Sequence, residues 1–288
     1  MNKNVTIAHI SDLHLAGKDD RRQIALLDRL LDELCGRAYD HVVITGDLID
    51  TANPDHWLVV MAVLERHGLF SWQKTTLIPG NHDLINLEEE MRFYNALNPN
   101  ARERQTRLRN KLSRFCDIFQ PLITGEGKTS GCFPFIKVFH YGSFCLALVA
   151  VNSVFPWSGA DNPLGARGYV PREELRLLTE QQVADALEGC FVIGLCHHAY
   201  RVYGSDALID QAFDWTMELK NRNEWLHFMK ILHARMVLHG HFHRFQSYLA
   251  DGMTFINGGS FRFSPNRYSE ILIGPDGRWS QRFVLFRS

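Results

Sequence analysis

The chain has 288 residues, of which 45% are hydrophobic and 22% charged, and its formal net charge is -1. These values are typical of a globular protein with a sizeable core, and near-neutrality gives no overall field that favours nucleic acid or an anionic membrane as a partner. No apolar run approaches the ~20 residues that cross a bilayer. Residues 1–6 are polar and lack the apolar segment of a signal peptide, so the sequence predicts a cytoplasmic protein.

The six cysteines follow no recognisable spacing. They form no Cys-x-x-Cys pair, and most lie inside apolar segments: Cys35, Cys116, Cys132, Cys145, Cys190 and Cys196. Such spacing supports neither a disulfide framework nor a zinc–thiolate site. We therefore expect buried free thiols.

Strands alternate with helices in the first part of the chain. Short apolar runs predict strands at 5–10, 42–45 and 75–78, and apolar residues at helical spacing predict helices at 21–35 and 54–66. This alternation predicts parallel βαβ units.

The pattern changes at residue 86. Residues 86–119 are polar and helical in character, and we interpret residues 86–130 as an insertion that caps the site. Within it, residues 102–114 hold Arg102, Arg104, Arg107, Arg109, Lys111 and Arg114 against a single Glu103. This cluster is either a solvated helix face or a surface that guides a polyanionic substrate, nucleic acid or membrane.

The second half is richer in strands. A hairpin is expected at 133–139 and 144–151, a Gly- and Pro-rich loop at 155–168, helices at 172–187 and 223–232, a loop at 202–213, and strands at 191–195, 235–238, 246–249, 253–256, 270–273 and 282–286. No repeat or linker divides the sequence, so we expect a single domain over residues 1–288.

Five polar motifs each follow an apolar run. They are Asp12-Leu13-His14, Gly46-Asp47-Leu48-Ile49-Asp50, Gly80-Asn81-His82-Asp83, His197-His198 and Gly240-His241-Phe242-His243. Ligands collect beyond the carboxyl ends of strands in α/β proteins, so these side chains should converge. Clustered carboxylates repel one another unless a cation lies between them. Imidazole and carboxylate together suit Zn, Mn, Fe or Co better than Ca or Mg, and a pair of such ions favours phosphoester hydrolysis.

In order and spacing, these motifs resemble those of the calcineurin-like metallophosphoesterase superfamily: Asp-x-His, Gly-Asp-x-x-Asp, Gly-Asn-His-Asp/Glu, a later His, and Gly-His-x-His. The resemblance runs from Asp12 to His243. It implies a four-layer α-β-β-α sandwich of two mixed sheets. It also implies a metal-dependent phosphoric ester hydrolase in which a metal-bound hydroxide attacks the phosphorus.

The resemblance implies two divalent ions, Mn, Fe or Zn, each with three ligands of its own. One set is Asp12, His14 and His243, the other is Asn81, His197 and His241, and Asp47 bridges the two. His82 would face the leaving group and donate a proton, and Asp50 would orient its imidazole. Two alternatives remain: Asp50 caps the following helix instead, or His198 replaces His197 as ligand. Asp83 is expected to be structural.

The substrate is less well defined by sequence. The compact first motif and the His-His pair resemble a bacterial branch that includes cyclic-nucleotide and glycerophosphodiester phosphodiesterases. Thr51-Ala52 stands where protein Ser/Thr phosphatases carry Arg-Gly. We therefore expect a small phosphodiester. A phosphomonoester and a nucleotide-linked lipid pyrophosphate are the alternatives, with Arg167 and Arg244 as candidate specificity residues. A non-catalytic scaffold would lack ligands or His82, and all are present here.

Overall fold

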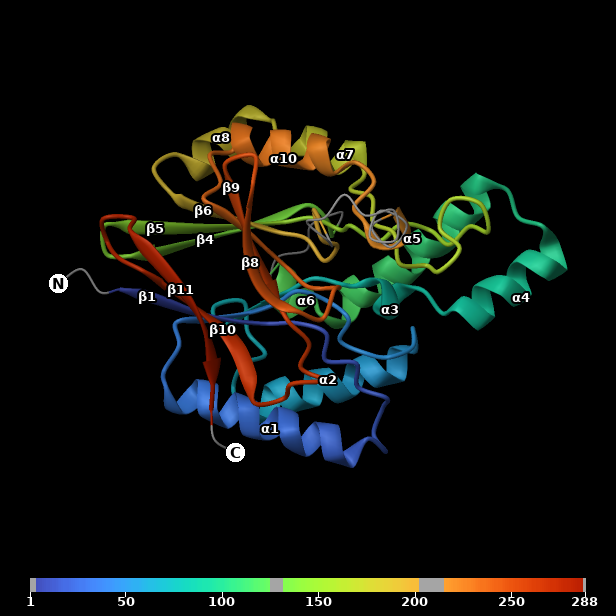
Figure 1. Ribbon diagram of the computed structural model, residues 1–288, viewed down its shortest axis with the longest axis horizontal. Helices are drawn as coiled ribbons and strands as arrows, with labels where there is room; N and C mark the ends of the chain where they lie inside the picture. The colour runs from blue at the N-terminus through green and yellow to red at the C-terminus, as the bar shows by residue number, and fades with distance from the viewer. Residues whose placement is uncertain (1–3, 125–131, 202–214, 287–288) are drawn as a thin grey trace.

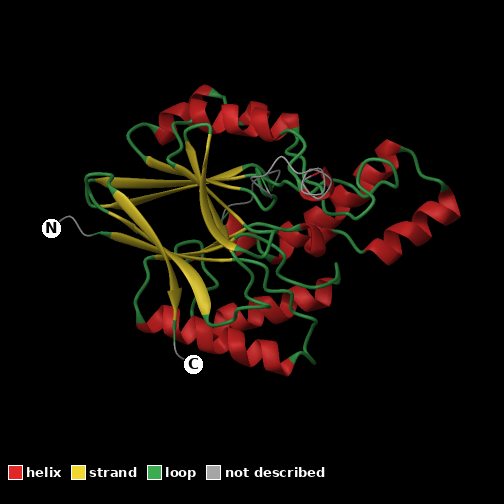
Figure 2. Ribbon diagram, in the orientation of Figure 1, coloured by secondary structure: helices red, strands yellow, loops and turns green. Residues whose placement is uncertain are grey.

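Two β-sheets pack face to face, with helices on both outer sides. The computed structural model describes residues 4–124, 132–201 and 215–286, and Figures 1 and 2 show the layers. The expected α-β-β-α sandwich is confirmed. The loop expected at 202–213 lies outside the described residues.

The first sheet has the strand order β11-β10-β1-β2-β3. Its strands are β1 (Val5–Ile10), β2 (His41–Ile44), β3 (Thr75–Leu77), β10 (Arg267–Ile273) and β11 (Trp279–Leu285). β1, β2 and β3 are parallel, whereas β10 and β11 pair antiparallel. The carboxyl ends of the three parallel strands therefore share one edge.

The second sheet has the order β4-β5-β6-β7-β9-β8. Its strands are β4 (Phe135–Tyr141), β5 (Phe144–Ala150), β6 (Phe191–Leu195), β7 (Met236–His239), β8 (Phe245–Ala250) and β9 (Met253–Gly258). β5, β6, β7 and β9 are parallel, and the hairpin expected between β4 and β5 is present. β6 and β7 end at the same rim of the sandwich as β1 and β2.

Helices cover the outer faces (Figure 1). The first sheet is covered by α1 (Arg21–Gly36) and α2 (Pro54–Arg66), and the second by α7 (Arg172–Leu177), α8 (Gln181–Leu187) and α10 (Arg222–Ile231). The helix expected at 172–187 is thus two helices. No helix among the described residues has the length and apolar character to cross a membrane.

The described residues between β3 and β4 form four helices: α3 (Asn81–Leu84), α4 (Leu87–Leu97), α5 (Ala101–Ile118) and α6 (Gln120–Ile123). α4 projects from the body and α5 runs back towards it (Figure 1). Asn100 and Glu103 form a reciprocal cap at the start of α5. Phe115 of α5 packs edge to face on Trp57 of α2, with ring centroids 5.5 Å apart, which anchors α5 to the first helical layer.

The expectation of buried free thiols is wrong for five of the six cysteines. Cys116 on α5 is bonded to Cys132, and Cys145 on β5 is bonded to Cys190. Cys35 is free but exposed, and Cys196 is free and buried as expected. The partners are 16 and 45 residues apart in sequence, so tertiary packing alone brings them together. In the second pair, both residues immediately precede the positions where β5 and β6 begin to pair.

We expect two thiols per chain to react with an alkylating reagent in denaturant without reductant, and six after reduction. Intact mass measures both counts. Reduction should lower the free energy of unfolding by about 2–4 kcal/mol for each bond, because a crosslink restricts the unfolded chain. Six reactive thiols before reduction would contradict the pairing.

Candidate metal centre

The polar motifs meet at one rim of the sandwich because each follows a strand that ends there. Asp12, Asp47 and Asn81 follow β1, β2 and β3 of the first sheet, and His197 and His241 follow β6 and β7 of the second. Main-chain hydrogen bonds join the motifs: the Asp12 N–H donates to the Gly46 carbonyl and the His14 N–H to that of Asp47, both at 3.0 Å.

Five of the seven expected ligands adopt a left-handed backbone conformation. Their φ angles are 56° at Asp12, 46° at His14, 50° at Asp47, 74° at His241 and 51° at His243. Only a few per cent of non-glycine residues have positive φ, and strained backbone persists where the surrounding structure enforces it. This concentration of strain indicates a functional site.

The neighbouring glycines serve two purposes. Gly46 has φ of 96°, a left-handed conformation that favours glycine and makes a sharp turn before Asp47. Gly80 has an ordinary φ of -104°, and a Cβ there would overlap the Asp47 carboxylate. A Cβ at Gly240 would likewise overlap the Asp12 carboxylate. These two glycines are therefore required for close packing.

The first cluster of ligand atoms holds Asp12, His14, Asp47 and His243. The Nε2 atoms of His14 and His243 are 3.1 Å apart, and the Nε2 of His243 is 3.1 Å from Oδ1 of Asp12. Both carboxylates are buried, and His243 is partly exposed.

The second cluster holds Asp47, His197 and His241, with the Oδ1 of Asn81 lying 3.2 Å from the Nε2 of His197. Asp47 belongs to both clusters. Its Oδ2 is 3.7 Å from Nε2 of His14 and 3.3 Å from Nε2 of His197. Its Oδ1 accepts the main-chain N–H of His82 at 2.9 Å, which fixes the carboxylate.

The donor set fits two transition-metal ions. Ligand atoms bound about 2.0–2.2 Å from one ion lie roughly 3–3.6 Å apart, as many of these do. Nδ1–H of His197 donates to the Thr45 carbonyl at 2.6 Å, so its Nε2 faces the cluster and would release its proton on binding a metal ion. Nε2 of His241 is buried and has no hydrogen-bond partner among the described residues. Orphaned imidazole nitrogens beside carboxylates are what a cation requires.

Charge compensation keeps the carboxylates ionised despite their burial. Desolvation raises the pKa of Asp47, but the nearby imidazoles of His197 and His82 outweigh it and hold the pKa well below its usual range. Burial lowers the pKa of His197, and the Asp47 carboxylate reverses this and raises it to about 9. Burial lowers the pKa of His241 to about 3, so that ring is neutral and available as a ligand.

The observed contact between Asp50 and His82 differs from the expected one in the atom of Asp50 that makes it. Nδ1–H of His82 donates to the main-chain carbonyl of Asp50 at 3.0 Å, not to its carboxylate. The carboxylate of Asp50 lies 3.5 Å from Nδ1 of His14 instead. Asp50 thus orients His82 through its backbone and supports His14 through its side chain. Asn53, not Asp50, caps α2.

Asp83 ties together the loops that carry the candidate metal ligands. Its buried carboxylate accepts main-chain N–H groups of Leu48 at 3.1 Å, Ile49 at 3.3 Å and Gly80 at 2.8 Å, and the indole N–H of Trp57 at 3.4 Å. Burial, and then the charge of Asp47, raises its pKa to about 7. The structural role expected for this residue is visible in these contacts.

Sequence reasoning missed Ser153. Its hydroxyl accepts the N–H groups of His197 and His198 at 3.1 and 3.2 Å and is 2.9 Å from Nδ1 of His198. His198 therefore faces Ser153, whereas His197 faces the cluster. No sequence signal marks a serine 44 residues from its partner.

The two candidate specificity arginines each contact an aromatic side chain of the chain itself. Arg167 is buried, where it contacts the Glu218 carboxylate and stacks over Trp215. Arg244 stacks over Phe242.

Comparisons with known proteins indicate the family and the fold. A family model described as calcineurin-like phosphoesterase matches residues 5–245. No curated protein sequence matches the chain. Among solved structures, a dimetal phosphatase from Danio rerio aligns over 98% of this chain and 99% of its own length, with a TM-score of 0.59 and 14% identity. A purple acid phosphatase from yellow lupin (Lupinus luteus) seeds aligns over 99% of this chain and 54% of its own, with a TM-score of 0.54 and 12% identity. These structures share the fold.

Asp83→Asn should weaken metal binding about 10- to 100-fold, because residues that hold metal-bearing loops affect affinity to this extent. It should also lower the free energy of unfolding by about 1–3 kcal/mol, since an amide satisfies fewer of the converging N–H groups. Competition with a chelator and denaturant unfolding measure the two effects. Asp55→Asn, at an exposed position on α2, is the matched control. Unchanged metal affinity in Asp83→Asn would refute the positioning role.

Proposed function

The chain belongs to the calcineurin-like phosphoesterase family, and on that premise we propose that it hydrolyses a small phosphodiester at a centre of two metal ions. Membership makes it a metal-dependent phosphoric ester hydrolase. The observation that carries the proposal is the Asp47 carboxylate, because its Oδ2 lies between imidazoles of two separate ligand clusters.

We assign Asp12, His14 and His243 to one ion, Asn81, His197 and His241 to the other, and Asp47 to both. Two ions held by these residues would supply Lewis acidity towards a phosphoryl oxygen and would lower the pKa of water. The ligand types favour Mn, Fe or Zn. The buried Cys196 thiol donates to the carbonyl of His198 and is not among the clustered donors.

His82 is assigned the proton transfer to the leaving group. The Asp50 carbonyl holds its proton on Nδ1, so Nε2 is the atom that takes up and delivers a proton. The ring is half-buried and lies edge to face with His14, their centroids 4.8 Å apart. The catalytic imidazole therefore borders the first ligand cluster.

The electrostatics of the rim support a diester. Arg262 is engaged by the Asp20 carboxylate at 2.7 Å, and Arg167 by Glu218. These arginines are therefore committed to carboxylates of the chain itself. A diester carries one negative charge on its phosphoryl group, whereas a monoester dianion carries two. A diester therefore needs fewer free cationic side chains around it.

One observation favours the lipid-linked pyrophosphate as a second candidate. Apolar side chains are exposed on α4 and the facing loop, namely Met91 at 50%, Leu97 at 68% and Leu164 at 55%. α4 belongs to the 86–130 segment, which we propose to be a cap within a single domain. An exposed apolar face of this kind suits an acyl chain.

The ion pairs of the basic cluster at residues 102–114 bear on the partners of the protein. Arg107 and Lys111 of the basic cluster pair with Glu89 and Glu90 of α4, which supports the solvated-face interpretation over nucleic acid or membrane binding.

A cytoplasmic location remains our expectation from sequence. The two disulfides weigh against it, because such bonds are rare in reducing compartments.

With added Mn, bis(p-nitrophenyl) phosphate should be hydrolysed about tenfold or more faster than p-nitrophenyl phosphate, compared by kcat/KM. Asp47→Asn should remove most activity and metal, because the bridging ligand serves both ions. Preference for the monoester would overturn the diesterase assignment. If the chain binds two metal ions but hydrolyses neither ester, the result would support the pyrophosphate alternative.

His82→Ala should retain both metals and slow turnover by about 10²–10⁴-fold for poor leaving groups. Good leaving groups depart without a proton, so their turnover should fall less. A series of aryl phosphodiesters of graded leaving-group pKa measures the difference, with the exposed His140→Ala as control. Equal slowing across the series would rule out the acid role.

A further inference from the structure

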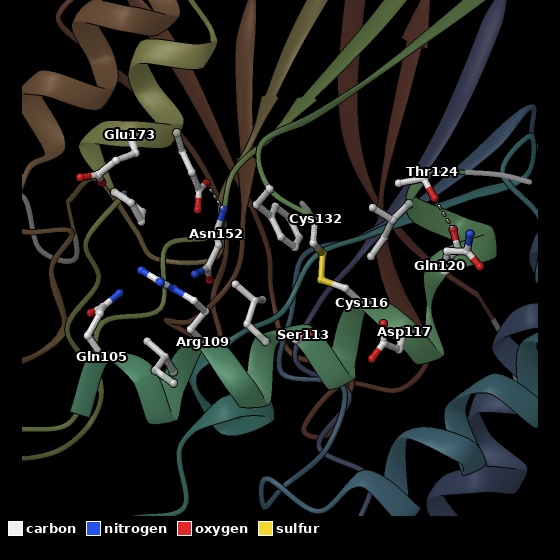
Figure 3. Close-up of a pocket in the computed structure, with 16 residues that line it drawn as sticks. Gln105, Arg109, Ser113, Cys116, Asp117, Gln120, Thr124, Cys132, Asn152 and Glu173 are labelled. Carbon is white, nitrogen blue, oxygen red and sulfur yellow. Dashed lines mark hydrogen bonds between the residues drawn. A yellow bond between two sulfur atoms is a disulfide. The ribbon is translucent and has the colours of Figure 1, made fainter. Parts of the chain in front are cut away.

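A cavity of about 700 Å³ lies between α5, α6 and the start of α7 (Figure 3). This volume is in the range of small-molecule sites, about 300–1,000 Å³. None of the seven assigned metal ligands lines it. The cavity is therefore separate from the metal centre.

One wall of the cavity is apolar. It consists of Leu108 and Leu112 of α5, Ile123 of α6, and Phe133 beside the Cys116–Cys132 disulfide. Leu108 and Ile123 are buried. Such a wall gains free energy by covering the apolar body of a ligand.

Two groups of N–H donors converge at the polar end of the cavity. Asn152 is only 3% exposed, and its Oδ1 accepts the Val154 N–H at 3.0 Å. Its Nδ2 has no hydrogen-bond partner among the described residues. Figure 3 shows this amide directed towards the guanidinium of Arg109. A buried amide whose donors face a cation is suited to an anionic group.

Arg109 differs from Arg104, Arg107 and Lys111 of the same helix. Arg107 and Lys111 pair with acidic residues of α4, and Arg104 donates to the Pro99 carbonyl. Within the part of the chain described, the guanidinium of Arg109 has neither an ion pair nor a hydrogen bond. Its planar array of donors matches a carboxylate in two parallel hydrogen bonds.

Acidic residues near the cavity do not oppose an anion at this end. Burial raises the pKa of Glu174 to about 8, so its carboxyl group keeps its proton at neutral pH. The Asn152 N–H also donates to it at 3.0 Å. The carboxylates of Glu173 and Asp117 point away from Arg109 (Figure 3). The polar end therefore presents a positive charge, N–H donors and a neutral acid.

We propose that this cavity binds a small carboxylate with an apolar body, the carboxylate between Arg109 and Asn152 and the body against Leu112 and Phe133. The site is independent of the proposed phosphodiesterase activity. It is nevertheless adjacent to the metal centre, because Asn152 precedes Ser153, which holds the His197 main chain.

Calorimetric titration of the metal-loaded full chain with octanoate tests the proposal, with octanol and octylammonium as isosteric probes below their aggregation limits. Octanoate should bind saturably with one site per chain. The other two should bind about tenfold or more weakly, because they lose the charge-assisted hydrogen bonds. Absence of saturable octanoate binding, or equal binding of octanol or octylammonium, would overturn the proposal.

Variants locate the site. Arg109→Gln and the cavity-filling Ser113→Trp should each weaken octanoate binding about tenfold or more. Arg114→Gln, which removes a charge from the same helix but does not line this cavity, should leave it unchanged. Wild-type melting temperatures would show that each variant is folded. Unaltered affinity in both Arg109→Gln and Ser113→Trp would place octanoate elsewhere and refute the site.

Discussion

The shared carboxylate of Asp47 is the constraint around which the structure is arranged. It is buried at the seam of two sheets, within reach of imidazoles from both. A carboxylate buried without compensation would take up a proton, because desolvation penalises its charge. Here His197 and His82 keep it ionised, and a cation on each side would serve the same purpose more strongly.

Holding this carboxylate in place requires unfavourable backbone conformations. Five expected ligands have positive φ, and strain of this kind costs of order 1–3 kcal/mol per residue. Main-chain hydrogen bonds between the motifs, and the four N–H groups gathered by Asp83, oppose that cost. Trp57 also packs on Phe115, so α5 contacts the side chain that donates to Asp83.

Much of the fold and centre could be predicted from sequence because the relevant signals are local. Helix α2 begins at a Pro preceded by a capping Asn, and its predicted bounds agree with the structure. The ligand motifs each follow a strand, and the parallel topology brings those strand ends together.

The features missed by sequence depend on packing between distant segments. Cys145 meets Cys190 because β5 and β6 are neighbours, and no spacing rule reveals that. Ser153 reaches the His197 main chain for the same reason. Whether the carboxylate or the carbonyl of Asp50 meets His82 depends on a rotamer and a turn, which composition does not determine.

The most direct test of the central claim is electron paramagnetic resonance of the chain loaded with two equivalents of Mn²⁺. Two ions that share the Asp47 carboxylate should give the signal of an exchange-coupled pair, and Asp47→Asn should abolish it. A spectrum of two independent Mn²⁺ ions in the wild-type chain, with both ions shown to be bound, would contradict the bridging role.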